Sequence, residues 1–549
     1  MNYKLLGRVL GKIMILESVL MLAPLLVSLI YREGIINNFA FIIPIFVLAL
    51  LGSLMQIPRP ERKSFYQKEG FALVAMVWIV MTIFGAVPFV INGDIPNYID
   101  ACFEIMSGFT TTGSSIISDI TVISYSSLFW RSFSHWIGGM GILVFVLIFI
   151  PESDDGSSMH LLRAESPGPK VGKIASKMKA TARILYLIYL GMTLLLIVIL
   201  MCGKIVDTEL ALKVTGNDYS KDKFFHALLT AFGCAGTGGF GFIPCSMQLF
   251  TPFAQYVVSI SLILFGCNFT LYYLILIGKI KDVFRSEEVK AYFSIVVAAV
   301  GLVFISLMAY NVSSIVVPPD YSTEEAFRHS LFQVASLMTT AGFTSTDYNV
   351  WPMLGKTVLV IVMFMGAMAG STAGGIKTSR VVIAVKGAYI NIRKLINPRY
   401  VPKAKFEGKL LEEKTINDVF SFYTMYFFIM IIAMFLISFD PVNGDTIRIT
   451  SNAINTVPPE QYYTYTNSTV VPTSEQFTYT VEHGFFTNFS AVLACISNIG
   501  PGFEAVGPYS CYAGYNWFST LVLTFTMLLG RLEILPVLIL FTPRTWRKV

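Results

Sequence analysis

The chain has 549 residues, of which 54% are hydrophobic and only 13% are charged. Soluble domains carry about 25% charged residues, so a water-soluble fold would lack the polar surface that it needs. The net charge of +6 is modest and the basic residues are dispersed, which excludes a nucleic-acid-binding patch. We therefore expect an all-α polytopic membrane protein that lies in the lipid bilayer.

Cysteine and histidine patterns give no sign of metal or redox chemistry. The seven cysteines include no C-x-x-C pair, and the five histidines include no H-E-x-x-H motif. No other catalytic constellation stands out. We expect no enzymatic activity and no cofactor bound by this chain.

Apolar runs of about 20 residues, the length that crosses a bilayer core, occur ten times along the chain. They lie near residues 13–30, 38–57, 70–92, 127–150, 184–203, 253–278, 291–310, 354–390, 417–438 and 515–541. The eighth run is interrupted by glycines. Four shorter apolar segments, one between the third and fourth runs and three later, are too short to cross and are interpreted as re-entrant helices.

Charge predicts the orientation of these runs. Lysine and arginine gather at the N-terminus, after the second run, in segments 151–183 and 279–290, and at the C-terminus. Ten crossings place all of these on one side. The largest opposite connection, 440–483, has only Arg448 among its basic residues and five acidic residues. By the positive-inside rule, both termini are expected in the cytoplasm.

The four short segments form an internal repeat. They align without gaps on one glycine each, preceded by a hydroxyl or amide side chain two residues before and by a small residue six residues before. The glycines are Gly113, Gly239, Gly342 and Gly500; the polar residues are Thr111, Thr237, Thr340 and Asn498; the small residues are Ser107, Gly233, Ser336 and Ala494. Each segment stands between two long runs. The predicted unit is an outer helix, a pore helix, a loop and an inner helix, repeated four times around a central pore, with two extra N-terminal transmembrane helices.

This arrangement is typical of a cation pathway. Four re-entrant helices would aim their partially negative C-terminal ends at a central cavity. Glycine lets the following backbone turn its carbonyl oxygens toward the axis, where a ring of carbonyls replaces the hydration shell of a cation. Asp119, Asp347 and Glu504 follow three of the glycines and would attract cations at the mouth. Each is equally consistent with an ordinary solvated loop acid.

Several motifs resemble one known family. They are residues 110–115 (TTTGSS), 135–141 (HWIGGMG), 237–240 (TGGF), 339–344 (TTAGFT), 370–377 (GSTAGGIK), 497–502 (SNIGPG) and 530–533 (GRLE). The chain resembles, over nearly its whole length, the TrkH-type membrane subunits of bacterial Trk potassium-uptake systems, within the Trk/Ktr/HKT superfamily. The two extra N-terminal runs are similar to TrkH-like rather than Ktr-like members.

The resemblance implies a selectivity filter in which backbone carbonyls bind K⁺, the transported ion. Its residues would be Thr111, Thr112, Gly113, Thr237, Gly238, Gly239, Thr340, Ala341, Gly342, Asn498, Ile499 and Gly500. The resemblance also implies a gate in the third inner helix, within 366–377, faced by an arginine of the fourth inner helix. The gate residues would be Gly370, Gly374, Gly375, Lys377 and Arg531.

Location and partners follow from the same resemblance. It implies a multi-pass protein of the bacterial cytoplasmic (inner) membrane and a homodimer with one pore in each protomer. It also implies a separate cytoplasmic regulatory subunit, TrkA-like, that binds NAD(H) or ATP/ADP. The expected divisions are 1–68 (two N-terminal helices), 69–160, 161–285 and 286–400 (repeats 1 to 3, the third with the gating loop), and 401–549 (repeat 4 with a long extracellular insertion).

Two functions stay open on the residues alone. The first is potassium uptake through a gated, channel-like pore, and the alternative is a symporter that couples potassium to H⁺ or Na⁺. Coupling would require a buried acid that titrates, and Glu104 in the first pore helix is the candidate. Arg531 could instead pair with Glu533, and Lys377 either lines the pore or lies at its cytoplasmic end. Arg131, His135, His226 and His329 are interpreted as structural.

Overall fold

The computed structural model describes most of the chain. The described residues are 2–58, 67–141, 178–215, 217–244, 246–312, 321–397, 405–451, 471–473 and 476–546. Parts of the fourth predicted run, of the basic segment 151–183, of the insertion 440–483 and of the C-terminal tail lie outside them.

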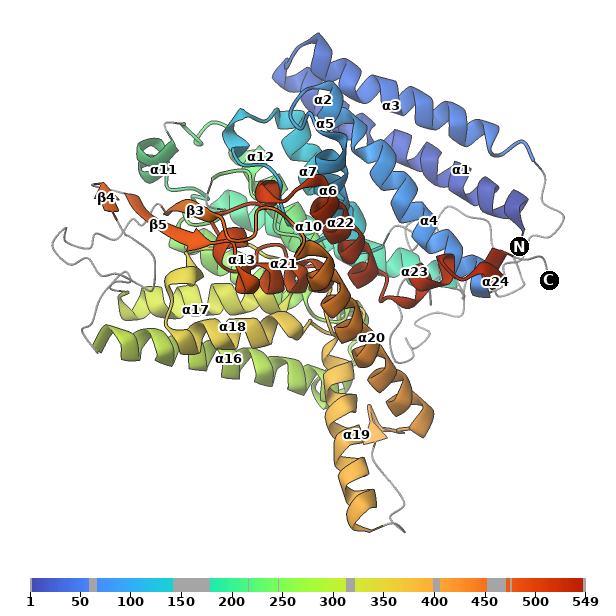
Figure 1. Cartoon of the computed structure of the whole chain (residues 1–549), viewed down its shortest axis with the longest axis vertical. Helices are drawn as coiled ribbons and strands as arrows, with labels where there is room; N and C mark the ends of the chain where they lie inside the picture. Colours follow the sequence, from blue (N-terminus) through green and yellow to red (C-terminus); the bar gives the residue numbers. More distant parts are fainter. Residues whose placement is uncertain are drawn as a thin grey trace.

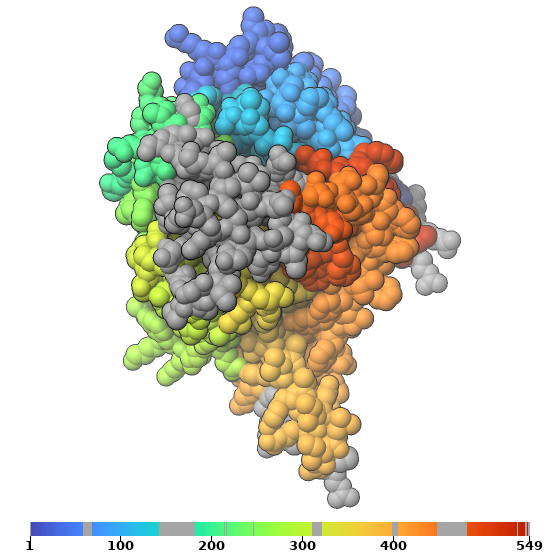
Figure 2. Space-filling view, turned by 60° about the vertical axis from the view of Figure 1, so that its left-hand side comes forward, coloured from blue at the N-terminus to red at the C-terminus, as the bar shows by residue number. Residues whose placement is uncertain are grey.

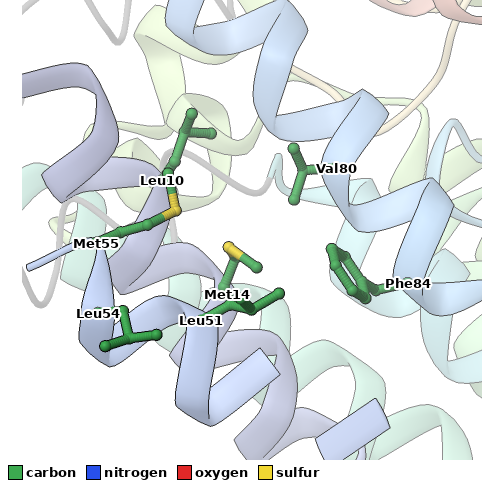
Figure 3. A pocket seen from close by; sticks show the side chains of 7 residues that line it. All are labelled: Leu10, Met14, Leu51, Leu54, Met55, Val80 and Phe84. Carbon is green, nitrogen blue, oxygen red and sulfur yellow. The ribbon is translucent and has the colours of Figure 1, made fainter. Parts of the chain in front are cut away.

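The N-terminal helices form a separate layer at one edge of the molecule (Figure 1). α1 (Tyr3–Leu20) and α2 (Leu22–Tyr31) follow one another, and α3 (Ile35–Leu54) packs back against α1. Gly11 and Gly52 make this close approach feasible, because a Cβ at either one would lie 2.6 Å from the carbonyl oxygen of the other. Near the same helices, an apolar cavity of about 450 Å³ is lined by side chains such as Met14, Met55 and Phe84 (Figure 3).

Four successive groups of helices make up the rest of the helical body. The first contains α4 (Gln67–Gly85), α5 (Val87–Ile91), α6 (Tyr98–Phe109) and α7 (Tyr125–Gly139). The second contains α10 (Met178–Cys202), α11 (Thr208–Thr215), α12 (Lys223–Gly236), α13 (Pro252–Phe265), α14 (Phe269–Leu276) and α15 (Ile280–Arg285). The third contains α16 (Glu287–Val312), α17 (Thr323–Met338), α18 (Met353–Phe364) and α19 (Thr378–Ile396). The fourth contains α20 (Glu413–Ile437), α21 (Phe485–Ser497), α22 (Trp517–Arg531), α23 (Leu535–Leu540) and α24 (Pro543–Trp546).

Apolar helices of membrane-crossing length dominate this body. Six described helical segments are long and apolar enough to span a bilayer by length and composition, and the α13–α14 pair makes a seventh if counted as one span. α18, α21 and α22 are shorter apolar helices. The prediction of a mostly helical membrane protein with several spans is confirmed, whereas the count of ten stays a prediction.

The sixth predicted run differs from the expectation of a continuous helix, because α13 and α14 are bent by 90° relative to each other. Two residues stand at the break. The Asn268 side chain accepts a hydrogen bond from the backbone N–H of Thr270 at 2.9 Å and so starts a new helix. Gly266 packs so closely that an added Cβ would lie 2.8 Å from the Thr339 side chain.

The expectation of an all-α fold is wrong in two connections that contain short strands. β1 (Lys405–Phe406) pairs with β2 (Lys409–Leu410) in a hairpin. β3 (Thr446–Ser451), β4 (Val471–Thr473) and β5 (Gln476–Glu482) form an antiparallel sheet in the order β3-β5-β4, with Thr446 opposite Glu482. The insertion is rich in threonine, tyrosine and valine, residues that favour strands. This sheet and the two chain termini lie at opposite ends of the molecule (Figure 1).

α19 projects from the helical body, with α20 beside it (Figures 1 and 2). Ile383 and Ile390 of α19 pack with Ile416 and Val419 of α20 in a small hydrophobic cluster apart from the main core. The outer face of α19 keeps large apolar side chains exposed, including Val385 and Ile392.

Candidate functional site

The four glycine loops share one backbone conformation. Each of the short helices α6, α12, α17 and α21 leads into a residue with left-handed φ, and a glycine with positive φ follows two residues later. The first set is Thr111, Thr237, Thr340 and Asn498, with φ from 52° to 56°; the second is Gly113, Gly239, Gly342 and Gly500, with φ from 73° to 106°. Left-handed φ is a genuine outlier for a β-branched threonine. Such strain persists only where the surroundings enforce it.

The same hydrogen bonds close each helix. The residue before each glycine donates its backbone N–H to the carbonyl of the small residue five positions earlier. The pairs are Thr112 to Ser107 (2.8 Å), Gly238 to Gly233 (2.9 Å), Ala341 to Ser336 (2.8 Å) and Ile499 to Ala494 (2.8 Å). This is the hydrogen bond of a Schellman C-cap. The repeat that was aligned from sequence is therefore also a repeat of backbone geometry.

The four loops touch in a closed ring that follows chain order. A Cβ added at Gly113 would overlap the carbonyl oxygen of Gly238, one at Gly239 that of Ala341, and one at Gly342 that of Ile499. At Gly500 a Cβ would lie 2.7 Å from the carbonyl oxygen of Thr112, which closes the ring. Glycine is required at all four positions by this approach as well as by φ. We call residues 111–113, 237–239, 340–342 and 498–500 the glycine ring.

A second irregular segment, residues 365–377, separates α18 from α19. It folds back on itself: the N–H of Gly366 donates to the carbonyl of Ile376 at 2.7 Å, and that of Thr378 donates to Ala367 at 3.0 Å. Gly370 and Gly375 have positive φ of 78° and 65°. We call this segment the intramembrane loop, because it interrupts an apolar run that would otherwise cross the bilayer.

The intramembrane loop lies against three members of the glycine ring. The N–H of Gly374 donates to Thr340 Oγ1 at 2.7 Å, and the Thr237 and Thr372 hydroxyls lie 3.4 Å apart. A Cβ at Gly374 would lie 2.8 Å from the Cβ of Asn498, in the fourth ring segment. The strained residues of the ring are thus also its contacts with the loop.

Arg531, at the end of α22, connects the loop to the remaining ring segment. Its Nη1 donates to the carbonyl of Thr372 at 3.0 Å and to Thr111 Oγ1 at 3.1 Å. Its Nη2 donates to the carbonyls of Gly138 and Gly139 at the end of α7. One guanidinium therefore joins the first and fourth helix groups to the loop of the third.

Sequence and structure comparisons identify the family. A model of the TrkH family, described as cation transport protein, matches residues 37–447 and 475–548. This chain belongs to the TrkH cation transport protein family. The Trk system potassium uptake protein TrkH of Escherichia coli (strain K12) is 30% identical over 554 residues, and its counterpart in Vibrio parahaemolyticus is 31% identical over 555; both alignments cover 100% of each chain.

A solved structure shows the same fold. The crystal structure of the potassium transporter TrkH from Vibrio parahaemolyticus matches with a TM-score of 0.77 and 28% identity, and it covers 100% of both chains. The family resemblance predicted from the sequence is confirmed. Membership of a transport family also confirms the expectation that the chain is not an enzyme.

Within this TrkH-family chain, Arg531 and Lys377 occupy different settings. The alternative partner of Arg531, Glu533, forms its ion pair with Arg380, which also stacks over the Phe422 ring at 4.1 Å. Lys377 precedes α19 and folds back onto the loop, where its ammonium group donates to the carbonyls of Ala373 and Gly374. The structure therefore brings both cations to the loop.

Glu104 is paired, which bears on its candidacy as a coupling acid. Its carboxylate lies 2.6 Å from Arg131 Nε, accepts the backbone N–H of Ile116 at 2.8 Å and accepts the Ser115 hydroxyl at 3.2 Å. Both side chains of the ion pair are buried, with exposed fractions of 0% for Glu104 and 2% for Arg131. The carboxylate is therefore paired with a charge and hydrogen-bonded within the first helix group.

The histidines also have structural contacts. His135 Nδ1 lies 2.8 Å from the carbonyl oxygen of Gly108, and its Nε2 accepts the backbone N–H of Phe240 at 3.3 Å, so this ring links α6 to the second loop. His226 stacks on Phe242. His329 lies 2.9 Å from the Ser345 hydroxyl.

Two of the three acids after the glycines serve local turns. Asp119 and Asp347 each accept the backbone N–H two residues later, at 2.9 and 3.0 Å, and so begin short 3₁₀ turns. Glu504 accepts the Thr487 hydroxyl at 3.0 Å. Asp119 is exposed, as a solvated loop acid would be, whereas Asp347 is buried with 4% exposed.

Sequence reasoning missed two loop contacts. Thr372 faces both Thr237 and Arg531, and Glu288, at the start of α16, accepts the backbone N–H of Ala369 at 2.7 Å. Thr372 lies inside the recognised 370–377 motif and was available as a signal. Glu288 lies in the basic segment 279–290, and no local pattern distinguishes it from its neighbours.

Proposed function

We propose that this chain carries potassium into the cell through a gated, channel-like pore. The observation that carries the proposal is the closed glycine ring, in which four loops from four helix groups meet backbone to backbone. The proposed fold has four pore repeats around a central axis, which comprise residues 69–160, 161–285, 286–400 and 401–549. The two N-terminal helices lie outside the pore.

The backbone carbonyls of the glycine ring are the proposed K⁺ ligands. Three properties support this role: the carbonyls come from four equivalent loops, the short helices that precede them end toward the ring, and no side chain occupies the glycine positions. Helix C-termini carry partial negative charge, which favours a cation. Carbonyl oxygens can replace the hydration shell of an ion whose charge is low. K⁺ is the cargo in this account.

The intramembrane loop and Arg531 form the proposed gate. The loop contacts Thr340 and Thr237 directly, and Arg531 joins it to Thr111. Gly370, Gly374 and Gly375 permit its backbone path, and Lys377 holds its end. A guanidinium beside a cation pathway opposes ion passage electrostatically. Displacing the loop would remove the obstruction and break the hydrogen bond between Arg531 and Thr372.

The coupled alternative requires a buried acid that titrates. Glu104 is ion-paired, which supports the passive account. Glu17 in α1 is fully buried, and its carboxylate oxygens have no hydrogen-bond partner among the described residues. It lies in the N-terminal layer, outside the four repeats. If Glu17→Gln or Glu104→Gln removed pH-driven uptake while passive flux remained, the symport alternative would replace the passive account.

The membrane location and the assembly of the chain are also proposals. A bacterial cytoplasmic membrane location with both termini inside agrees with the basic N-terminal segment and with the contact of the Tyr3 hydroxyl to the Trp546 carbonyl at 2.8 Å, which puts the two ends together. The exposed apolar face of α19 supports a homodimer. A nucleotide-binding regulatory subunit would dock on the cytoplasmic side.

Ion flux in proteoliposomes that contain only this protein tests the proposal. Potassium and sodium flux are measured for wild type and for Gly113→Ser. We expect wild type to conduct potassium along its gradient and to prefer it to sodium, and we expect the variant to lose that preference. Flux in wild type with unchanged selectivity in the variant would contradict the filter.

A further inference from the structure

The β1–β2 hairpin has an unusual residue at its turn. Phe406 pairs with Lys409, and the two residues between them, Glu407 and Gly408, have φ of 50° and 73°. Positive φ at both central positions defines a type I′ turn, for which asparagine, aspartate and glycine are the usual residues. A glutamate is strained there. Contacts of the Glu407 side chain must therefore offset this backbone strain.

The side chain of Glu407 contacts the start of α16. Glu407 Oε1 accepts the Ser286 hydroxyl at 2.8 Å and the backbone N–H of Glu288 at 3.0 Å. The first N–H groups of a helix have no partner inside the helix, and a carboxylate at this end is favoured by the helix dipole. Glu407, itself exposed, thus caps α16 from a hairpin about 120 residues away in the chain.

The same helix end holds the intramembrane loop. Glu288 is buried, with 7% of its side chain exposed, and it accepts the backbone N–H of Ala369. Its backbone N–H donates to Glu407, and its carboxylate accepts a hydrogen bond from the loop. Glu288 therefore links the two segments, so that a displacement of the hairpin is transmitted to the loop through a single residue.

The hairpin is also attached to the helix that follows the loop. Phe406 is buried in the hydrophobic cluster of α19 and α20. Lys386 of α19 donates to the carbonyl of Lys405 at 2.6 Å and forms an ion pair with Glu287. The hairpin consequently clamps the start of α16 to α19, and the intramembrane loop lies between these two attachments.

From these contacts we infer that Glu407 and Glu288 form a latch that positions the intramembrane loop. The inference rests on the proposed function, since it takes the loop as the gate. Both are positioning residues that act through the loop backbone and do not contact the ion. The exposed hairpin is then the surface at which a cytoplasmic event reaches the gate: pulling Glu407 from α16 frees Glu288 and releases Ala369.

Hydrogen exchange of the full-length protein, together with ion flux, tests the latch. The variants are Glu407→Ala and Glu288→Ala, with Glu407→Gln as the conservative change that keeps an acceptor oxygen. Glu412→Ala is the matched control, because Glu412 is also exposed and its side chain makes no capping hydrogen bond. We expect the Ala369 amide to exchange about tenfold faster in both alanine variants, as for the loss of a hydrogen bond to a charged group.

The remaining expectations separate a latch from a general loss of stability. The exchange rate of the Ala369 amide in Glu407→Gln should stay near that of wild type, and the double alanine variant should exchange this amide no faster than either single variant. Potassium flux should rise severalfold in the alanine variants, with unchanged selectivity. Unchanged exchange in Glu407→Ala would overturn the latch. So would faster exchange with unchanged flux, or equal effects of Glu412→Ala. If wild type carried no potassium, the proposed function would fail, while the exchange rates would still decide whether the latch exists.

Discussion

The glycine ring and the intramembrane loop are neighbours built on opposite principles. The ring has four copies of one backbone turn, and each copy packs its glycine against the backbone of the next. The loop occurs once, in the third group, and is held by side chains: Thr340 and Glu288 of the same group and Arg531 of the fourth. Backbone contacts without side chains leave the ring no room to adjust, whereas hydrogen bonds can be exchanged for water. The difference suits one element to selection and the other to control.

The largest expected effect comes from adding one methyl group to the ring. Gly239→Ala would force a Cβ into the carbonyl of Ala341 at a residue with φ of 73°. Overpacking alone costs about 1–3 kcal/mol, and the strained φ adds to it. We expect loss of potassium-selective flux in proteoliposomes. The control is Gly191→Ala in α10, where a Cβ meets no atom within 4 Å; a similar loss there would contradict the packing argument.

A smaller but opposite effect is expected from the loop. Arg531→Ala removes the hydrogen bonds to Thr372 and Thr111 and the positive charge beside them. Losing hydrogen bonds of a charged donor costs about 1.5–3 kcal/mol, which corresponds to roughly a ten- to hundredfold rise in flux if those bonds hold the gate shut. Potassium flux measures this effect, and Arg285→Ala, which also removes one positive charge but at an exposed position, is the charge-matched control. A fall in flux would mean that Arg531 supports the open pathway.

The ion pair behind the first loop should affect stability more than transport. Removing one member of a buried pair costs about 3–5 kcal/mol because the other charge is left without compensation. We expect Glu104→Ala to lower the melting temperature strongly. Glu104→Leu combined with Arg131→Met should restore much of that loss. A double variant as unstable as the sum of the single variants would show that the two groups act independently.

The smallest effect is expected at Asp119, at the proposed mouth of the pore. Asp119 is exposed, and asparagine can keep its turn contacts, so Asp119→Asn changes little besides charge. An exposed charge contributes about 1 kcal/mol or less and is screened by salt. We expect the potassium concentration for half-maximal flux to rise less than about threefold at low ionic strength, and not at all near 0.15 M. An equal change at both ionic strengths would assign Asp119 a direct role.

The sequence predicted the ring far better than the loop's surroundings. Gly113 and Thr111, with their counterparts, stand at fixed spacing because each copy makes the same local turn, and local turns leave a repeated pattern. The contacts of the loop join residues that are distant in the chain, as with Arg531 and Thr111, which are 420 residues apart. Nothing local encodes such a pair, so the role of Arg531 came from family resemblance.

Two further features were beyond sequence patterns for the same reason. At the bend between α13 and α14, Gly266 packs against Thr339 of another group. The hairpin turn at Glu407 resembles an ordinary charged connection, and only its contact with Ser286 gives it meaning. Sequence periodicity reports which face of an element is apolar, but it does not report which distant polar group that element meets.

The most direct test of the division between ring and loop is a bilayer recording with potassium on one side and sodium on the other. The reversal potential reports selectivity and the current reports gating, in one trace. The account predicts that Gly113→Ser moves the reversal potential toward sodium, and that Arg531→Ala increases the current at an unchanged reversal potential. If Arg531→Ala moved the reversal potential as far as Gly113→Ser does, selection and control would reside in one element, and the account would be wrong.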